Sequence, residues 1–299
     1  MTTLVIGASG FIGRSILRKI QGPVIAFDKV STNNKFLREV EIVSSDVKNI
    51  NDLLVGRKIQ AIIYLSSATT SLDQFNLDEE KIKIDLENAK LIVNFCRANK
   101  VKKLIFASSG GVIYGAHNIP PFKEGMALYP RSIYGLTKML LEKYFLESLS
   151  NSLTKVLILR VANPYGEGQN LNGSQGVIPI FLRKIANGET LYLRNRNSRR
   201  DYVYIDDVAN AFHGALSYEG KENIFNIGGG GSIGLGELTS LLEIIVGKRA
   251  KIVDVPPVDT DLENSFLDIS LAKSELSWAP EVNLKAGIIK TFNWISDEN

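Results

Sequence analysis

The feature that most constrains this chain is an apolar run that leads directly into closely spaced glycines. Residues 4–6 are Leu-Val-Ile, and the sequence GASGFIG follows from Gly7 to Gly13. Gly7 suits a tight turn after a strand, Gly10 lets the backbone approach a bound group, and Gly13 lets the next helix pack closely on a sheet. The N-terminus of that helix offers free N–H groups and a positive dipole to phosphates. The spacing therefore predicts the first strand, turn and helix of a dinucleotide-binding sheet, with helix packing alone as the other explanation of the glycines.

A second apolar run, residues 24–27, ends in Asp28, which lies 21 positions after Gly7. An acidic side chain at this distance is placed to bond the ribose hydroxyls of a dinucleotide, and it would repel a 2′-phosphate. The sequence therefore favours NAD over NADP, and Lys29 weakens that preference without reversing it. The residues of this region predicted to bind the cofactor are Gly7, Gly10, Phe11, Ile12, Gly13, Asp28 and Lys29.

Composition limits the functional classes. The chain has 299 residues, of which 44% are hydrophobic, and a net charge of +3, which predicts about two domains and a substantial core. The basic residues form no long run, so nucleic acid is not expected as a partner. The short group Arg194, Arg196, Arg199 and Arg200 is either a solvated loop or a site for an anionic substrate. Cys96 is the single cysteine, which excludes an internal disulfide and a cysteine-rich metal site, and no metal is expected.

The sequence also carries no signal for a membrane. No run of about eighteen apolar residues is present, and the first residues enter a strand without a basic leader. We therefore expect no membrane insertion and a cytoplasmic location.

Short apolar runs alternate with helical patterns through the middle of the chain. The runs at 61–65, 103–107 and 156–159 are bounded by polar or turn residues, and helical periodicity separates them. This alternation predicts an α/β fold, a doubly wound parallel sheet of the Rossmann type, with a smaller C-terminal substrate-binding domain. We expect residues 1–162 and 205–228 to form the NAD-binding domain, and residues 163–204 and 229–299 to form the substrate-binding domain.

Tyr134 and Lys138 are the first candidates for chemistry. A tyrosine has an ordinary pKa of about 10 and is a poor base at neutral pH unless a cation stabilises its phenolate. Four residues apart on a helix, the two side chains share one face, so the Lys138 ammonium is placed to stabilise the phenolate and to bond a cofactor ribose. The pair comes after the glycines and after the sequence SSGGVIYG at residues 108–115. This order favours a catalytic pair over a chance spacing.

Taken together, the motifs resemble those of the extended short-chain dehydrogenase/reductase family. Within it they resemble the NAD-dependent nucleotide-sugar epimerases and dehydratases, of the UDP-glucose and UDP-N-acetylglucosamine 4-epimerase type. The shared motifs are the N-terminal glycines, the serines and Tyr-Gly of residues 108–115, Tyr-Gly-x-x-Lys at 134–138, RVANPYG at 160–166, RDYVYIDDV at 200–208, Asn-Ile-Gly at 226–228 and Trp-Ala-Pro at 278–280.

The resemblance implies roles for individual residues. Tyr134 would be the catalytic base, with Lys138 as its partner. Further cofactor contacts are implied for Asp46, Val47, Leu65, Ser66 and Ser67, the first two near the adenine. Substrate contacts are implied for Ser108, Ser109, Gly110, Tyr134, Asn163, Val177, Arg200 and Asp261. Among these, Asn163 and Arg200 would hold the diphosphate of a nucleotide sugar, because a guanidinium fork suits phosphate oxygens. A salt bridge from Arg200 to Asp201 or Asp206 is the alternative.

One departure from the family pattern concerns the catalytic hydroxyl. Gly110 stands where that hydroxyl usually lies. We expect Ser109 to supply it, because Ser109 is adjacent and the glycines behind it would let the loop shift. The alternative is that Ser108 and Ser109 only bond the backbone at the end of their strand.

Two other departures affect the surroundings. Val258 stands where an arginine for the diphosphate is common, which leaves Arg194, Arg196 or Arg199 to compensate. Asp85 stands where many relatives carry Asn, and we expect no more than a local adjustment of a helix.

The sequence after the serines also limits the reaction. Dehydratases of the family carry an acidic pair directly after the catalytic hydroxyl, and this chain has Gly111 and Val112 there. Dehydration is therefore not expected, and the resemblance implies a 4-epimerase that interconverts nucleotide-diphosphate hexoses through a 4-keto intermediate, most simply UDP-glucose and UDP-galactose or their N-acetyl forms. The small Ser265 would leave space for an N-acetyl group. The alternatives are a reductase of nucleotide-linked 4-keto-6-deoxyhexoses and a non-catalytic NAD-binding relative.

The predicted helices near 79–98 and 133–150 resemble those that form a four-helix dimer interface in the family. Leu91, Phe95, Met139 and Phe145 would give that interface its apolar surface. We therefore expect a homodimer. The alternative is that these residues face the sheet, since a core helix has the same period.

Overall fold

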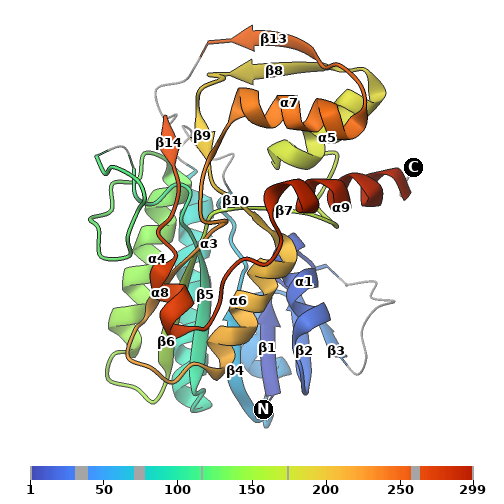
Figure 1. The fold of residues 1–299 in the computed structure, drawn as a ribbon. Coiled ribbons are helices and arrows are strands. Elements are labelled where there is room, and N and C mark those ends of the chain that lie inside the picture. The colour runs from blue at the N-terminus through green and yellow to red at the C-terminus, as the bar shows by residue number, and fades with distance from the viewer. Residues whose placement is uncertain are drawn as a thin grey trace.

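A computed structural model describes residues 2–30, 40–70, 78–115, 117–173, 175–256 and 263–297. Its centre is a seven-stranded sheet in the order β11-β6-β5-β4-β1-β2-β3, in which every pair of neighbours is parallel (Figure 1). The strands are β1 (Thr2–Ile6), β2 (Val24–Asp28), β3 (Val40–Ser44), β4 (Ile59–Tyr64), β5 (Lys103–Ser109), β6 (Lys155–Val161) and β11 (Ile224–Ile227). The predicted doubly wound parallel sheet is confirmed. Because the chain reverses its direction of travel between β1 and β4, the crevice at their carboxyl ends is the expected ligand site.

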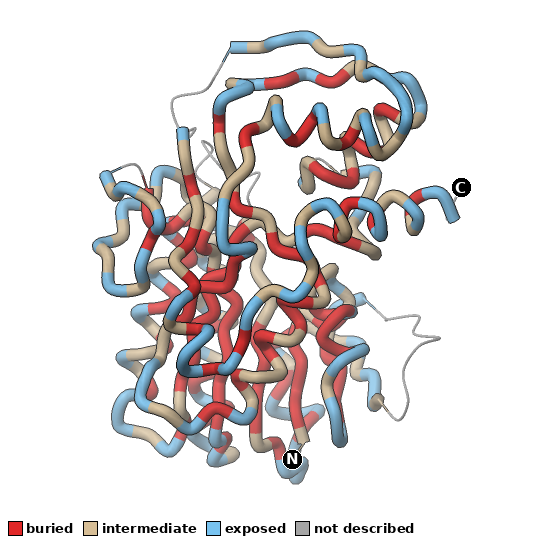
Figure 2. The backbone as a smooth tube through the Cα atoms, viewed as in Figure 1, coloured by how far each residue is buried: buried red, intermediate tan, exposed pale blue. Residues whose placement is uncertain are grey.

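Helices cover both faces of this sheet. One face carries α1 (Phe11–Lys19) and α6 (Ile205–Ser217), and the other carries the short η1 (Val47–Asn49) and α2 (Ile50–Leu53) with the long α3 (Glu79–Ala98) and α4 (Ile133–Leu149). Successive side chains of each strand enter opposite cores, as Leu4 and Val5 do, because side chains alternate along a strand. The central strands are therefore apolar along their whole length and buried on both faces (Figure 2).

A second lobe lies beyond the carboxyl ends of the large sheet (Figure 1). Its core is formed by α5 (Val177–Asn187), α7 (Leu235–Val246) and α9 (Leu284–Asp297), together with the parallel pair β8 (Thr190–Arg194) and β13 (Lys251–Val255). Short strands connect the lobes: β7 (Asn163–Tyr165), β9 (Arg199–Arg200), β10 (Tyr202–Tyr204), β12 (Ile233–Gly234) and β14 (Asn264–Ser265). The carboxyl edge of the sheet thus faces a separate apolar core.

One segment of the range 229–299, which we expected to lie wholly in the substrate-binding domain, packs instead against the large sheet. The chain from Leu267 to Trp278, with α8 (Ser270–Glu275), packs into the core of the large sheet beside β11. Its apolar residues complete that face of the sheet, so this part of the range 229–299 belongs structurally with the dinucleotide-binding lobe.

Two of the four apolar residues that we expected at a dimer interface are buried in the core, whereas Leu91 and Met139 are half-buried. Phe95 and Phe145 are 1% and 0% exposed and belong to the core under α3 and α4. The expectation is wrong for these two side chains, because they lie on the faces that α3 and α4 turn toward the sheet. The large apolar residues that α4 leaves exposed are Leu136 and Leu140, which are 46% and 41% exposed.

Candidate active site

The glycine loop, from Gly7 to Gly13, leaves little room for side chains at its glycines. Gly7 has a φ of +85°, and a Cβ on Gly13 would lie 2.3 Å from the Gly7 carbonyl oxygen. The loop carries the chain from β1 into α1, and all five residues predicted here, Gly7, Gly10, Phe11, Ile12 and Gly13, line a cavity of about 630 Å³. A bare backbone turn at the N-terminus of a helix is what a dinucleotide pyrophosphate needs. These residues therefore fit NAD.

The acidic end of β2 lies beside the same loop. The Asp28 carboxylate accepts a hydrogen bond of 2.9 Å from the backbone N–H of Ser9. Lys29 turns to Asp46, with 2.9 Å between Nζ and Oδ2, and the Lys48 N–H and Lys29 hold the pKa of the Asp46 carboxyl below its ordinary value. Val47 is 4% exposed and packs in the core, which leaves its backbone as the part that a nucleotide could contact.

The residues that follow β4 close the other side of the loop. The Leu65 side chain lines the cavity, and its N–H donates to the carbonyl of Ile6 at 2.9 Å. Ser66 packs directly on Gly7: a Cβ added to Gly7 would lie 2.9 Å from the backbone nitrogen of Ser66. Ser67 faces away from the cavity lining and bonds the Asp85 carboxylate at 2.9 Å.

Tyr134 and Lys138 meet as their spacing predicts. Ser132 caps α4 by accepting a hydrogen bond of 3.1 Å from the N–H of Gly135, which starts the helix just before Tyr134. The Lys138 ammonium nitrogen lies 5.6 Å from the centre of the Tyr134 ring and 4.8 Å from that of Phe106. It also donates to the Ala107 carbonyl at 3.1 Å. The ammonium is therefore fixed beside the phenol at the carboxyl end of β5.

The electrostatics of the pair are dominated by burial. Burial raises the pKa of Tyr134 to about 12, opposed by a hydrogen bond from Ser109 and reinforced by the charge of Asp85. Burial lowers the pKa of Lys138 to about 8, opposed by the charges of Asp85 and Glu142. The site thus holds a cation whose charge is lost only a little above neutral pH.

Ser109 lies where the catalytic hydroxyl is needed. Ser109 is the last residue of β5 and lines the cavity together with Tyr134, whose pKa the Ser109 side chain lowers. Gly110 turns away instead, because a Cβ there would lie 2.5 Å from Leu267 Cδ1 and 2.9 Å from the Arg160 carbonyl oxygen. Gly110 is not among the residues that line the cavity, and its contact with substrate stays a prediction. Ser108 is buried at the cavity, and its hydroxyl has no hydrogen-bond partner among the described residues.

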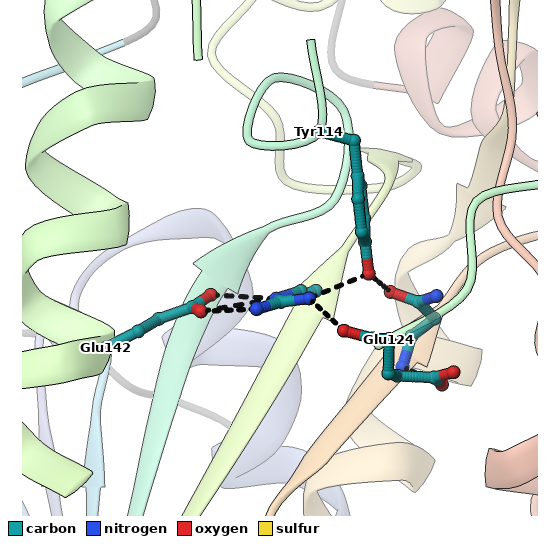
Figure 3. A network of polar contacts seen from close by, with 5 residues as sticks. Tyr114, Glu124 and Glu142 are labelled. Carbon is teal, nitrogen blue, oxygen red and sulfur yellow. Dashed lines mark hydrogen bonds and ion pairs between the residues drawn. The ribbon is translucent and has the colours of Figure 1, made fainter. Parts of the chain in front are cut away.

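A buried ion pair anchors the helix that carries Tyr134. Arg160 of β6 bonds Glu142 of α4, with 2.7 Å between Nη2 and Oε2, and both side chains are almost completely buried (Figure 3). The same guanidinium donates to the Tyr114 hydroxyl at 2.9 Å, and that hydroxyl donates to Asn226 at 2.6 Å. The network joins α4 to β6 and β11. Because removing one partner from a buried pair leaves an uncompensated charge, it fixes the position of α4 strongly.

Three of the residues predicted for the substrate line the same cavity as the glycine loop. Asn163, Val177 and Arg200 all line it. The Asp201 carboxylate accepts hydrogen bonds from the backbone of Gly229 and Leu267 at 2.7 and 3.2 Å, and burial raises its pKa to about 6. The Asp206 carboxylate lies 3.6 Å from the ammonium of Lys19. Both carboxylates proposed as alternative partners of Arg200 are thus engaged by other groups.

Other sequence predictions are placed as follows. Arg196 pairs with Asp254 at 2.6 Å and Arg199 with Glu237 at 3.0 Å, so neither compensates for a missing arginine at the cavity. Asp261 and Val258 lie outside the described residues. Ser265 is 2% exposed in β14 and does not line the cavity, so the expectation that it makes space for an N-acetyl group is wrong.

Several lining residues were not predicted from the sequence. They are Arg131, Pro164, Tyr165, Gln169, Gln175 and Tyr202. Tyr165 and Tyr202 lie within the motifs RVANPYG and RDYVYIDDV and Gln169 lies just after the first of them, whereas Arg131 follows no pattern. Among the described residues that line the cavity there is no Asp, Glu or His, and its charged side chains are Arg131 and Arg200. The cavity therefore suits an anionic ligand and offers Tyr134 as its proton carrier.

The described residues show neither a metal-binding cluster nor a helix that could span a membrane. They hold no group of three or more His, Cys, Asp or Glu side chains arranged to bind a metal ion. None of their helices is both long and apolar enough to cross a membrane.

The parallel sheet, the glycine loop at its switch point and the Tyr134 and Lys138 pair define a dinucleotide-dependent enzyme of the short-chain dehydrogenase/reductase type. A family model described as the NAD dependent epimerase/dehydratase family matches residues 3–228. The chain belongs to this family, which confirms the predicted resemblance and NAD as the cofactor.

Relatives of known name match over nearly their whole length. A dTDP-4-dehydro-6-deoxyglucose reductase of Escherichia coli is 39% identical over 309 residues, which cover 96% of this chain and 95% of the relative. A UDP-glucose 4-epimerase of Mycolicibacterium smegmatis is 30% identical over 321 residues and all of both chains. The solved structure of a UDP-glucose 4-epimerase from Thermotoga maritima with UDP-glucose superposes with a TM-score of 0.92, at 29% identity over 100% of this chain and 99% of that one.

Proposed function

We propose that this protein is an NAD-dependent 4-epimerase of nucleotide-diphosphate hexoses, with UDP-glucose and UDP-galactose or their N-acetyl forms as its substrates. The observation that carries the proposal is the cavity itself, where Ser109 and Lys138 surround Tyr134 and no described lining residue is a second acid or base. Epimerisation at C4 needs one proton carrier, whereas elimination of water needs additional acid and base groups. The two UDP-glucose 4-epimerases described above support this choice.

The residues act on the 4-hydroxyl of the sugar. Tyr134, as phenolate, takes the proton of that hydroxyl, while the Lys138 ammonium stabilises the phenolate and Ser109 donates a hydrogen bond to the reacting oxygen. NAD held at the glycine loop, by Gly7, Gly10 and Gly13, would supply the reversible hydride chemistry at C4. When the resulting 4-keto sugar has turned its other face, Tyr134 returns the proton to the oxygen. Proton and hydride both return to the sugar, so the cycle consumes no cofactor.

The rest of the substrate is held by the opposite wall. Arg200 provides a guanidinium fork for the diphosphate, and Asn163 and Val177 lie beside it in the same wall. Because the diphosphate is bound far from the reacting carbon, the hexose can rotate about it while the nucleotide stays in place. We take the base to be uracil, as in the UDP-glucose complex of the related structure.

A reductase of nucleotide-linked 4-keto-6-deoxyhexoses is the second candidate. The relative from Escherichia coli at 39% identity favours it. Such an enzyme would use Tyr134 as an acid, once per turnover, and would exchange oxidised for reduced cofactor each time. The same cavity serves Tyr134 as an acid in a reductase and as a base in an epimerase.

We also propose how the protein is assembled. The lobe around the large sheet binds NAD and the lobe around α5, α7 and α9 binds the nucleotide sugar, in the cytoplasm. Two copies associate through α3 and α4, where Leu136 and Leu140 form an exposed apolar pair one turn apart.

The deciding experiment uses the purified protein with UDP-glucose, UDP-galactose, their N-acetyl forms and a dTDP-4-keto-6-deoxyhexose. An epimerase interconverts the UDP-sugars without added cofactor and retains its NAD. Stoichiometric consumption of NADH or NADPH with the keto sugar alone would establish the reductase. NAD binding with no turnover of any nucleotide sugar would establish the non-catalytic relative and refute both enzymes.

A further inference from the structure

A carboxylate lies buried under the cofactor side of the cavity. Asp85 of α3 is 0% exposed and accepts four hydrogen bonds from the segment that follows β4. The Ala68 N–H donates to Oδ1 at 2.6 Å, and the Thr69 N–H donates to Oδ2 at 3.1 Å. The hydroxyls of Ser67 and Thr69 donate to Oδ2 at 2.9 and 2.7 Å. All four donors are neutral, so they satisfy the oxygens of Asp85 without cancelling a charge.

The backbone N–H groups of Ala68 and Thr69 favour aspartate over asparagine at position 85. Each carboxylate oxygen receives one of the two N–H groups, and an N–H group cannot rotate to become an acceptor. An asparagine at this position would direct its own NH₂ group at one of them. A buried unsatisfied donor is expensive, so the local fold prefers Asp85 with two accepting oxygens.

The segment that Asp85 holds is continuous with the cofactor side of the cavity. Leu65 lines the cavity and Ser66 packs on Gly7, three and two residues before Ala68, the first backbone donor to Asp85. Anchoring residues 67–69 to α3 therefore restrains the backbone that closes the glycine loop.

The charge of Asp85 also reaches the catalytic pair. It raises the pKa of both Tyr134 and Lys138, and it raises the pKa of Tyr64. The other charged group of the described structure that acts on Lys138 is Glu142, which is already paired with Arg160. Asp85 lies on α3, which packs against the helix α4 that carries Lys138, and the hydrogen bonds to Asp85 come from neutral donors, whereas Glu142 is paired with Arg160.

We propose that Asp85 is a positioning residue with two roles: its carboxylate clamps residues 67–69 against α3 to hold the cofactor, and its charge balances the Lys138 ammonium beneath Tyr134. The proposal rests on the proposed function only where turnover is measured. Cofactor retention and the ionisation of Tyr134 test it independently of any sugar.

The test compares Asp85→Asn with Thr69→Val in the NAD-loaded protein. Phenolate absorbance after a rapid pH jump, taken as the difference from a Tyr134→Phe background, reports the titration of Tyr134 before the protein unfolds. Asp85→Asn should lower the Tyr134 midpoint by about one pH unit, because a nearby negative charge is removed, and should release NAD at least about tenfold faster. Thr69→Val keeps the Asp85 charge but removes the hydroxyl that donates to Asp85 Oδ2. NAD should therefore dissociate faster, while the titration midpoint of Tyr134 stays unchanged.

Asp207→Asn is the matched control. Asp207 is also buried and accepts two backbone hydrogen bonds, from Glu281 and Val282 at 3.1 Å each, but it lies on α6 away from the cavity lining. Its variant should lose thermal stability and leave both readouts unchanged. A Tyr134 midpoint that does not move in Asp85→Asn would overturn the electrostatic role, and unchanged NAD release would overturn the clamp. If the protein turns over UDP-sugars, the alkaline limb of its pH profile should also move down in Asp85→Asn, as Lys138 loses its proton earlier. Absence of all sugar turnover would refute the proposed function and leave the other two readouts to decide on Asp85.

Discussion

Ser109 at the end of β5 and Tyr134 of α4 line the same cavity, and the Ser109 side chain opposes the rise in the pKa of Tyr134 that burial causes. The strand and the helix α4 approach each other here because the buried Arg160 and Glu142 pair joins α4 to β6, the neighbour of β5. Gly110 assists by packing its bare backbone against Leu267, which lets the chain turn away directly after Ser109. The position of the hydroxyl is therefore a consequence of packing behind the cavity.

Replacing Tyr134 by Phe removes only the phenol oxygen. We expect interconversion of UDP-sugars to fall by about 10²- to 10⁴-fold or more, the usual contribution of a positioned proton carrier. NAD content and thermal stability should stay close to those of the wild type, since the ring remains. Unchanged turnover would refute Tyr134 as the base.

Ser109→Ala should lower turnover about tenfold or more, because an active-site hydrogen bond to the reacting oxygen is lost. Ser108→Ala is the control, as its hydroxyl has no described partner, and it should have a smaller effect. A larger loss in Ser108→Ala than in Ser109→Ala would reverse the assignment.

Gly110→Ser tests whether a hydroxyl at residue 110 could replace that of Ser109. Its Cβ would meet Leu267 Cδ1 at 2.5 Å, so the variant should lose about 1–3 kcal/mol of stability through overpacking. Combined with Ser109→Ala it should restore no activity, because the new hydroxyl points away from the cavity. Rescue of turnover in the double variant would show that residue 110 reaches the substrate.

Lys138→Met should inactivate the enzyme and stabilise the cofactor-free protein. Burial lowers the pKa of Lys138 to about 8, from an ordinary value of 10.5. At pH 7 the folded protein therefore holds an unfavourably buried ammonium, and removing it should raise the free energy of unfolding by about 1–3 kcal/mol. Between pH 8 and 10.5 the unfolded wild type binds more protons than the folded form, so wild-type stability rises with pH and the advantage of the variant should shrink.

Denaturant unfolding at several pH values measures this difference. Lys143→Met, on an exposed part of the same helix, is the control and should change stability little. An advantage of Lys138→Met that stays constant from pH 7 to pH 10.5 would contradict the buried-cation explanation.

Asp28→Asn should weaken the preference for NAD over NADP. The carboxylate repels a 2′-phosphate, so its removal should raise the affinity for NADP relative to NAD by about tenfold. Dissociation constants for both cofactors, measured by calorimetry, give this ratio. Asp46→Asn is the comparison, because it breaks the pair with Lys29 and leaves Asp28 in place; if it changes the ratio more than Asp28→Asn, Lys29 controls the preference.

Leu136→Glu with Leu140→Glu tests the proposed dimer. Both side chains are exposed on α4, so charges there should not disturb the core, but they should separate two copies that meet at this face. Sedimentation velocity should show the wild type as a dimer and the variant as a monomer with unchanged circular dichroism. A wild-type monomer, or a variant that remains a dimer, would place the interface elsewhere or remove it.

The local features could be predicted from the sequence because each has a local cause. Gly7, Gly10 and Gly13 are dictated by backbone geometry, and Tyr134 with Lys138 by the pitch of a helix. The alternation of apolar runs and helical patterns predicted the parallel sheet, since buried strands are apolar along their whole length.

The tertiary structure decided which of several equivalent residues faces the cavity. Sequence position could not tell whether Ser109 or residue 110 meets Tyr134, because that depends on how Leu267, some 150 residues later, packs against Gly110. Nor could it show that Phe95 and Phe145 face the sheet while Leu136 and Leu140 face outward. The sequence predicts only a local adjustment of a helix at Asp85, whereas its complete burial depends on how α3 packs in the folded protein. Helical period fixes which residues share a face, but only the packing of distant segments fixes what that face meets.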